Sequence, residues 1–144
     1  MKNHQMVGFD TSIFIYHIEE VPRYSTAAAE AFDSLANGSI LGVTSMLTLM
    51  EIVVRPLQMG RPEIADRYGV LLNAFPHLII PNLDQFTARQ AAEFRAAYGL
   101  KPAGALQVAA CVQQGATAFL TNDKMLRRLV EVETLLLDDF VNDD

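Results

Sequence analysis

The amino-acid sequence predicts an α/β fold with three layers (α/β/α), in which a mostly parallel sheet of about five strands lies between helices. Short apolar runs alternate along the chain with longer segments that have the spacing of amphipathic helices. The short runs are almost continuously apolar, which is typical of parallel strands covered on both faces. The 144 residues, 51% of them hydrophobic, can form one compact core, so we expect a single domain over residues 1–144.

Five apolar runs are expected to form the strands. Each is too short for a helix, and most end in polar or turn-forming residues. The expected strands are Met6–Phe9, Ser39–Val43, Leu78–Ile80, Ala116–Leu120 and Thr134–Leu137.

Longer segments between these runs are expected to form helices. Serine, threonine and aspartate can cap a helix start, and proline is tolerated in the first turn. Helices are expected to begin at or after Ser25 or Thr26, Ser45, Pro62, Asp84 and Pro102. Gly38, Gly99 and Gly115 are expected to end three of them, and Pro56 to kink or end the second.

Composition and charge exclude several classes of protein. The formal charge of −6 argues against binding nucleic acid through overall charge, although a basic patch or a bound cation could attract it locally. The single cysteine, Cys111, excludes a disulfide-stapled protein and a zinc ribbon, and its apolar setting suits a buried side chain. No stretch approaches the ~20 apolar residues of a membrane helix, so we expect a cytoplasmic protein without membrane association.

Two carboxylates are predicted to lie at the carboxyl ends of strands. Asp10 directly follows the run Val7–Phe9, and Asp123 follows the segment Ala118–Asn122. Ligands bind beyond this edge of an open parallel sheet, so both are candidates for a functional site. Each could instead serve only to cap the helix that follows, because aspartate is a preferred N-cap residue.

Glu51 is a third candidate, because it is the only charged residue of the apolar segment Met46–Val54. An isolated carboxylate in apolar surroundings would cost several kcal/mol, so it should have a partner. It could also face water or pair with Arg55 one turn later. If Glu51 converges with Asp10 and Asp123, the oxygen ligands suit Mg²⁺ or Mn²⁺. Such an ion activates water and stabilises phosphoryl charge, as phosphodiester hydrolysis requires.

Basic residues lie near the proposed acids in the sequence. Three directly follow Asp123, and the fourth lies one turn after Glu51. They could contact the phosphates of a substrate, or they could form a solvated helix face. The candidates for substrate binding are Lys124, Arg127, Arg128 and Arg55.

Four segments in a fixed order carry a resemblance to a known family. They are Asp10-Thr11-Ser12 after an apolar run, Glu51 within Thr-Leu-Met-Glu-Ile, Leu-Lys-Pro-Ala-x-Ala-Leu-Gln-Val-Ala-Ala from Leu100, and Phe-Leu-Thr-Asn-Asp from Phe119. Together they resemble a PIN domain, from about Val7 to Asp138. The small size is most similar to the VapC-type ribonuclease toxins of toxin–antitoxin pairs, or to a stand-alone relative.

The resemblance implies a PIN-like fold and a metal-dependent endoribonuclease that hydrolyses single-stranded or looped RNA with Mg²⁺ or Mn²⁺. It also implies a homodimer and a small antitoxin protein that neutralises the toxin. The residues that it assigns to the site are the metal ligands Asp10, Glu51 and Asp123, and the orienting residues Thr11, Ser12 and Asn122.

Gly104 departs from the pattern of the family, which usually carries an aspartate at this position. Glycine in a helix costs up to about 1 kcal/mol relative to alanine, whereas the helix dipole favours aspartate in the first turn. We therefore interpret Gly104 as the replacement of a metal-site carboxylate, natural or introduced, that lowers metal affinity and impairs this chain. Alternatively, Gly104 marks close helix packing and no acid belongs there.

Other functional classes fit the sequence less well. A phosphatase of the haloacid-dehalogenase type would need an aspartate at Ser12, and a receiver-type phosphoacceptor would need paired acids after the first strand. The three histidines, His4, His17 and His77, lack the spacing of metal ligands. The main alternative is a catalytically inactive PIN fold that binds RNA or a protein, and Gly104 is its best support.

Overall fold

A computed structural model of the chain, which describes residues 3–141, contains one five-stranded sheet. Its strands are β1 (Met6–Phe9), β2 (Leu41–Val43), β3 (Leu78–Ile79), β4 (Ala118–Thr121) and β5 (Glu133–Leu136). Their order is β3-β2-β1-β4-β5, and every neighbouring pair is parallel. Each strand overlaps the apolar run that predicted it, so the predicted parallel sheet is confirmed.

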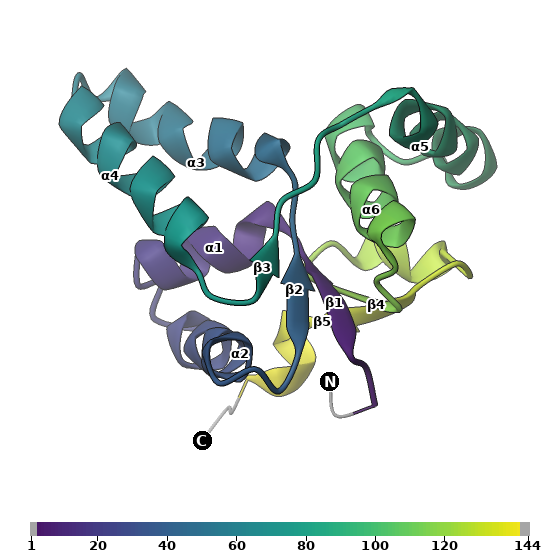
Figure 1. Cartoon of the computed structure of the whole chain (residues 1–144), viewed down its shortest axis with the longest axis horizontal. Coiled ribbons are helices and arrows are strands. Elements are labelled where there is room, and N and C mark those ends of the chain that lie inside the picture. Colours follow the sequence, from purple (N-terminus) through teal and green to yellow (C-terminus); the bar gives the residue numbers. More distant parts are fainter. Residues whose placement is uncertain (1–2, 142–144) are drawn as a thin grey trace.

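Helices cover both faces of this sheet (Figure 1). They are α1 (Thr11–Ile18), α2 (Ser25–Ala36), α3 (Met46–Gln58), α4 (Pro62–Ala74), α5 (Gln85–Tyr98) and α6 (Pro102–Gln114). Two short 3₁₀ helices, η1 (Lys124–Arg128) and η2 (Leu137–Phe140), follow β4 and β5. In Figure 1, α1 to α4 lie on one side of the strands, and α5 and α6 lie on the other. The predicted α/β/α architecture is confirmed.

Local sequence signals fix most of the helix ends as predicted. The Ser45 hydroxyl accepts the Leu47 N–H at 3.2 Å at the start of α3, and the Asp84 carboxylate accepts the Thr87 N–H at 2.9 Å at the start of α5. Helices α4 and α6 each begin at a proline, whose missing N–H would have no partner there. Gly99 ends α5 with a left-handed φ of 68°.

One expectation about helix ends is wrong, and one of two alternatives is excluded at another. Helix α2 begins at Ser25, but the N-cap position is Tyr24 and no side chain caps this helix, because Ser25 already belongs to its first turn. Helix α3 continues past Pro56 and does not end there. Pro56 lacks only its own N–H, and the Met59 N–H still reaches the Arg55 carbonyl oxygen at 3.0 Å, so the last turn closes.

Two hydrophobic clusters lie on the two faces of the sheet, and Met6 of β1 packs against the second of them. Val7 and Phe9 pack into a cluster with Phe32 of α2. Phe119 of the neighbouring strand belongs to the second cluster, together with Cys111 of α6. The Cys111 thiol is fully buried, and burial raises its pKa, so it is a packing side chain as predicted.

Gly8 is required by a close approach between β1 and the second cluster. A Cβ atom at this position would lie 2.7 Å from Phe119 Cδ1 and 2.8 Å from Cys111 Cβ. Because both neighbours are core side chains, the sheet or α6 would have to shift to accept a methyl group. We expect Gly8→Ala to lower the free energy of unfolding by about 1–3 kcal/mol, measured by urea denaturation.

Gly69→Ala is the matched control for this substitution. A Cβ atom at Gly69, within α4, makes only an ordinary contact at 3.6 Å with Leu49 Cδ1. Alanine also has the higher helix propensity, so this variant should be as stable as the parent or more stable. Equal stability of the two variants would contradict the close approach at Gly8.

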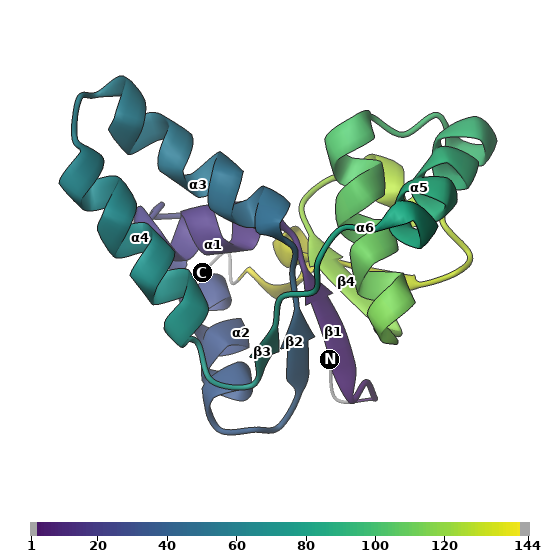
Figure 2. The ribbon, with the colours of Figure 1, turned by 45° about the horizontal axis from the view of Figure 1, so that its top comes forward.

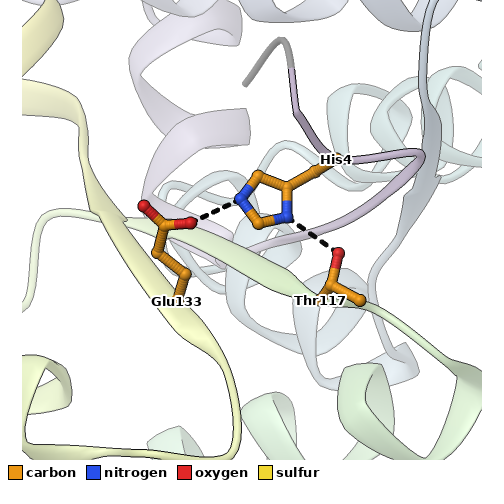
Figure 3. Close-up of polar contacts among 3 residues, drawn as sticks. All are labelled: His4, Thr117 and Glu133. Atoms are coloured by element: carbon orange, nitrogen blue, oxygen red, sulfur yellow. Dashed lines mark hydrogen bonds and ion pairs between the residues drawn. The ribbon is translucent and has the colours of Figure 1, made fainter.

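His4 ties the N-terminal segment to the sheet (Figure 3). Its Nδ1 lies 2.8 Å from Thr117 Oγ1, and its Nε2 lies 2.6 Å from Glu133 Oε2. Thr117 directly precedes β4 and Glu133 begins β5, so the contact lies at the amino-terminal end of these strands. His4 therefore belongs to the end of the sheet opposite to the carboxylates that follow the strands.

Candidate functional site

The carboxyl ends of β1 and β4 emerge side by side at the middle of one edge of the sheet. Phe9 pairs with Leu120 in parallel register, so the residues that follow the two strands are neighbours. Asp10 follows β1, and its N–H donates to the Leu120 carbonyl oxygen at 2.9 Å. Thr121 ends β4, two residues before Asp123. The predicted placement of Asp10 and Asp123 at strand ends is confirmed.

The Asp10 carboxylate is held by two hydrogen bonds. Oδ1 accepts the Thr11 N–H at 2.8 Å, which is the N-cap contact of α1, and Oδ2 accepts the Thr121 hydroxyl at 2.6 Å. The capping role considered from the sequence is therefore present, and the second bond directs the carboxylate toward β4. Each oxygen keeps a lone pair for a further ligand.

Asp123 is connected to Asp10 through the Thr121 hydroxyl. The Asp123 N–H donates to Thr121 Oγ1 at 3.1 Å, while the Asp123 carboxylate accepts the Met125 N–H at 3.0 Å as the N-cap of η1. Thr121 thus fixes the two acids relative to each other. Sequence reasoning missed this threonine, whose only signal is its position between the apolar residues of the strand and Asp123.

Glu51 reaches the same region from α3. Its Oε1 accepts the Thr11 hydroxyl at 2.8 Å, while the Thr11 N–H donates to the capping carboxylate of Asp10. Glu51 is exposed, which is the alternative that the sequence left open, and it lines a small pocket together with Ile52. Arg55 pairs with Glu19 at 2.8 Å, so the partner of Glu51 is Thr11 and not Arg55.

The charges of Glu51 and Asp123 act on Asp10. Burial raises the pKa of the Asp10 carboxyl above its usual value, and the negative charges of Glu51 and Asp123 raise it further. Hydrogen bonds from Thr121 and Thr11 oppose this increase. A cation bound nearby would relieve the repulsion among the three carboxylates.

The oxygen donors of this region suit Mg²⁺ or Mn²⁺ in their chemistry. In the part of the chain that the structure describes, the side chains do not form a complete metal-binding site. Within residues 3–141, no group of three or more His, Cys, Asp or Glu side chains lies close enough together to hold a metal ion. Asp10, Glu51 and Asp123 therefore face a common region without forming a closed ligand cage.

Gly104 borders this region on the side of Asp123. It is the third residue of α6, and with Asp123 it lines a cavity of about 300 Å³. A Cβ atom built on Gly104 meets nothing within 4 Å. The alternative that Gly104 permits close helix packing is therefore wrong, and the cavity has room for a larger side chain.

The three residues expected to orient ligands differ in how they are held. Thr11 is buried and donates to Glu51. Asn122 joins two elements, because its amide donates to the Tyr16 hydroxyl at 3.3 Å and accepts the Asp138 N–H at 3.0 Å. The Ser12 hydroxyl is buried and has no hydrogen-bond partner within residues 3–141.

The four basic candidates lie on two elements. Lys124, Arg127 and Arg128 belong to η1 and are exposed. Arg127 pairs with Asp139 at 2.8 Å, and Arg128 donates to the Tyr98 carbonyl oxygen at 3.4 Å. Substrate binding by these residues and by Arg55 of α3 stays a prediction.

Gln107 of α6 is a buried polar residue that sequence reasoning did not select. Its side chain contacts hydroxyl groups of α1, α3 and the turn between β2 and α3. The signal available was one polar residue within the apolar segment Ala105–Cys111. Its contacts with distant threonines depend on the tertiary structure and could not be predicted from that segment.

Comparison with protein families matches residues 8–132 to the PIN domain. A search of curated protein sequences gave no match. No helix within residues 3–141 is long and apolar enough to cross a membrane.

Several solved structures are similar to this chain. VapBC2 from Rickettsia felis, bound to a promoter DNA fragment, gives a TM-score of 0.73 at 15% identity, covering 91% of this chain and 98% of that one. DNA-bound VapBC from Salmonella typhimurium gives a TM-score of 0.69 at 18% identity, covering 92% of this chain and 98% of that one. A toxin–antitoxin complex from Klebsiella pneumoniae gives a TM-score of 0.67 at 22% identity, covering 88% of this chain and 94% of that one. Because the three identities are below 25%, these similarities show a shared fold and no more.

Proposed function

This chain belongs to the PIN-domain family, and from that premise we propose that it is a metal-dependent endoribonuclease acting as the toxin of a toxin–antitoxin pair. The observation that carries the proposal is the set of hydrogen bonds that ties three acids to the carboxyl edge of the sheet. Thr121 donates to Asp10 and accepts the Asp123 N–H, and Thr11 donates its N–H to Asp10 and its hydroxyl to Glu51. Ligands bind at this edge in parallel sheets, which supports a shared role for these acids.

Asp10, Glu51 and Asp123 would hold Mg²⁺ or Mn²⁺ through their carboxylate oxygens. When bound, the ion supplies an activated water and stabilises the charge that develops on the phosphoryl oxygens. Thr121 and Thr11 keep the acids oriented, because their hydroxyls donate to Asp10 and Glu51.

The substrate would be held by groups that surround these acids. Lys124, Arg127 and Arg128 extend from η1 directly after Asp123, and the buried, unpaired Ser12 hydroxyl would reach a phosphate oxygen only if the site opened. Arg55 would contribute from α3 after release from Glu19. These basic side chains offset the repulsion between RNA and an acidic protein.

We propose that Gly104 weakens metal binding, because it leaves unfilled space where a further carboxylate would stand beside Asp123. The same observation favours a second candidate function, a catalytically inactive PIN fold that binds RNA or a protein. The incomplete ligand set within residues 3–141 also favours that candidate.

The proposed partner is a small antitoxin protein, in line with the toxin–antitoxin complexes among the similar structures. A protein partner is also favoured by apolar side chains on α3, which projects with α4 from the rest of the molecule (Figure 2). Met46, Met50, Val54 and Leu57 are between 39% and 53% exposed. We further propose a homodimer, which light scattering of the purified chain would test.

Cleavage of single-stranded and structured RNA tests the function directly. The wild-type chain and Gly104→Asp are each incubated with RNA in Mg²⁺, in Mn²⁺ and in EDTA. Ion-dependent cleavage by either chain supports the nuclease, whereas RNA binding without cleavage by both supports the inactive binding module. Cleavage that persists in EDTA would contradict metal dependence.

A further inference from the structure

A buried hydrogen-bond network connects Gln107 to the candidate site. The Gln107 side chain is 1% exposed, and its Oε1 accepts the hydroxyl of Ser45. Its Nε2 lies 2.6 Å from Thr48 Oγ1, 3.2 Å from Thr44 Oγ1 and 3.3 Å from Thr11 Oγ1. One amide therefore contacts hydroxyls of α1, α3 and the turn before α3.

The orientation of this amide follows from its partners. Ser45 accepts the Leu47 N–H and has a single hydroxyl proton to donate, which it gives to Gln107 Oε1. The two protons of Nε2 consequently point at the three threonine hydroxyls. Gln107 is thus a donor toward this side of the network.

The protons of two threonines are already committed elsewhere. Thr44 donates to the Phe9 carbonyl oxygen at 2.9 Å, and Thr11 donates to Glu51 at 2.8 Å. The Phe9 carbonyl and the Glu51 carboxylate only accept in these two bonds, so the protons come from Thr44 and Thr11.

The hydroxyl of Thr48 has one proton, whose acceptor determines where the two Gln107 protons go. Thr48 Oγ1 lies 2.7 Å from Thr44 Oγ1 and 3.1 Å from Thr11 Oγ1, and it can donate to only one of them. Gln107 donates to Thr48 with one proton and to the remaining threonine with the other. In both arrangements the Thr11 oxygen receives a proton, and its own proton has Glu51 as its sole acceptor.

We propose that Gln107 is a positioning residue, which acts through Thr11 to hold the exposed Glu51 carboxylate beside Asp10. Without the amide, Thr48 no longer receives a proton from Gln107, and Thr11 can donate to Thr48 in place of Glu51. Glu51 then loses the hydrogen bond that orients it. The consequence for cleavage rests on the proposed function, whereas the direction of the Thr11 proton does not.

The test compares Gln107→Met with Gln113→Met, a matched substitution on the same helix. Gln113 is exposed and contacts only Gln90 among the hydrogen bonds of its side chain in the described residues. The first measurement is the exchange of the Thr11 hydroxyl proton with water, followed by NMR. We expect exchange to be about three- to tenfold faster in Gln107→Met, the range that corresponds to one buried hydrogen bond. Gln113→Met should match the parent.

The second measurement is RNA cleavage in the Gly104→Asp chain with and without each substitution. Misplacement of Glu51 should lower kcat about tenfold to a hundredfold while KM stays unchanged, because RNA still binds to the basic side chains. Gln107→Leu also removes the amide and provides a second variant if Gln107→Met does not fold, with the same expected result. Thr48→Val keeps the shape of the core and serves as a further control. Because valine also removes the acceptor that would compete with Glu51 for the Thr11 proton, Thr48→Val should behave like the control.

Three results would overturn parts of this inference. Unchanged Thr11 exchange in a folded Gln107→Met or Gln107→Leu variant would contradict the donor direction of Gln107. Faster exchange with unchanged kcat would contradict a positioning role in the reaction. If no chain cleaves RNA, the proposed function fails, and the hydroxyl exchange still decides whether Gln107 directs the Thr11 proton.

Discussion

Gly104→Asp is expected to raise the rate of Mn²⁺-dependent RNA cleavage about 10²-fold or more. An added carboxylate beside Asp123 would complete an oxygen ligand set, and a held metal ion contributes several kcal/mol to transition-state stabilisation, where about 1.4 kcal/mol is a factor of ten. The position accepts the side chain, because a Cβ atom on Gly104 meets nothing within 4 Å. Single-turnover cleavage of a labelled RNA would measure the change.

Gly104→Ala is the control for this substitution. It supplies the Cβ atom and up to about 1 kcal/mol of helix propensity without a carboxylate, so it should stabilise α6 and leave cleavage unchanged. Without metal, the aspartate variant should be less stable than the alanine variant, because its charge adds to those of Asp10, Glu51 and Asp123.

Metal-linked stability distinguishes the two variants without any measurement of activity. Binding to the folded state stabilises a protein by about 2.7 kcal/mol when the free ion concentration is 100 times the Kd. The melting temperature of Gly104→Asp should therefore rise with Mn²⁺, and that of Gly104→Ala should not. Equal responses of the two would show that this position has no part in metal binding.

Most of the fold could be predicted from the sequence, because apolar runs and helix-capping residues act locally. The five strands and the starts at Ser45, Pro62 and Pro102 depend on short segments, and the structure has them. Of the two alternatives at Pro56, a kink or an end, the end is excluded, because the last turn still closes through neighbouring residues.

The site was predictable where it depends on topology and unpredictable where it depends on side-chain contacts. Asp10 and Asp123 follow adjacent parallel strands, so their proximity follows from the strand order. The link through Thr121 and the donor role of Gln107 depend on hydroxyl orientations in the packed structure. The exposure of Glu51 likewise depends on which face of α3 meets the core, and its apolar sequence neighbours did not indicate this.

Asp10→Asn is expected to abolish cleavage, by about 10³-fold or more in the Gly104→Asp chain, and at the same time to stabilise the fold at neutral pH. Asparagine offers one carbonyl oxygen where aspartate offers two anionic oxygens, so metal affinity is lost. Because asparagine is as good an N-cap as aspartate, the Thr11 N–H keeps its acceptor.

The increase in stability follows from the raised pKa of Asp10, which burial causes first and the charges of Glu51 and Asp123 increase. A carboxyl whose pKa is higher in the folded state favours folding below its unfolded value, and that contribution is lost as the pH rises through the folded value. At neutral pH the ionised Asp10 therefore destabilises the protein. The melting temperature of Asp10→Asn relative to the parent should increase from acid to neutral pH and then level off.

Asp84→Asn is the matched control, since Asp84 also caps a helix but has a lowered pKa, caused by hydrogen bonds from Thr87. Its ionised form is favoured in the folded state, so this substitution should give no gain in stability at neutral pH, and cleavage should not change. A protein made more stable and inactive only by Asp10→Asn would mean that the fold tolerates a repulsive charge for the sake of metal binding. If Asp10→Asn instead lowers the melting temperature at neutral pH as Asp84→Asn does, Asp10 is a structural cap, and the case for a shared metal site is lost with it.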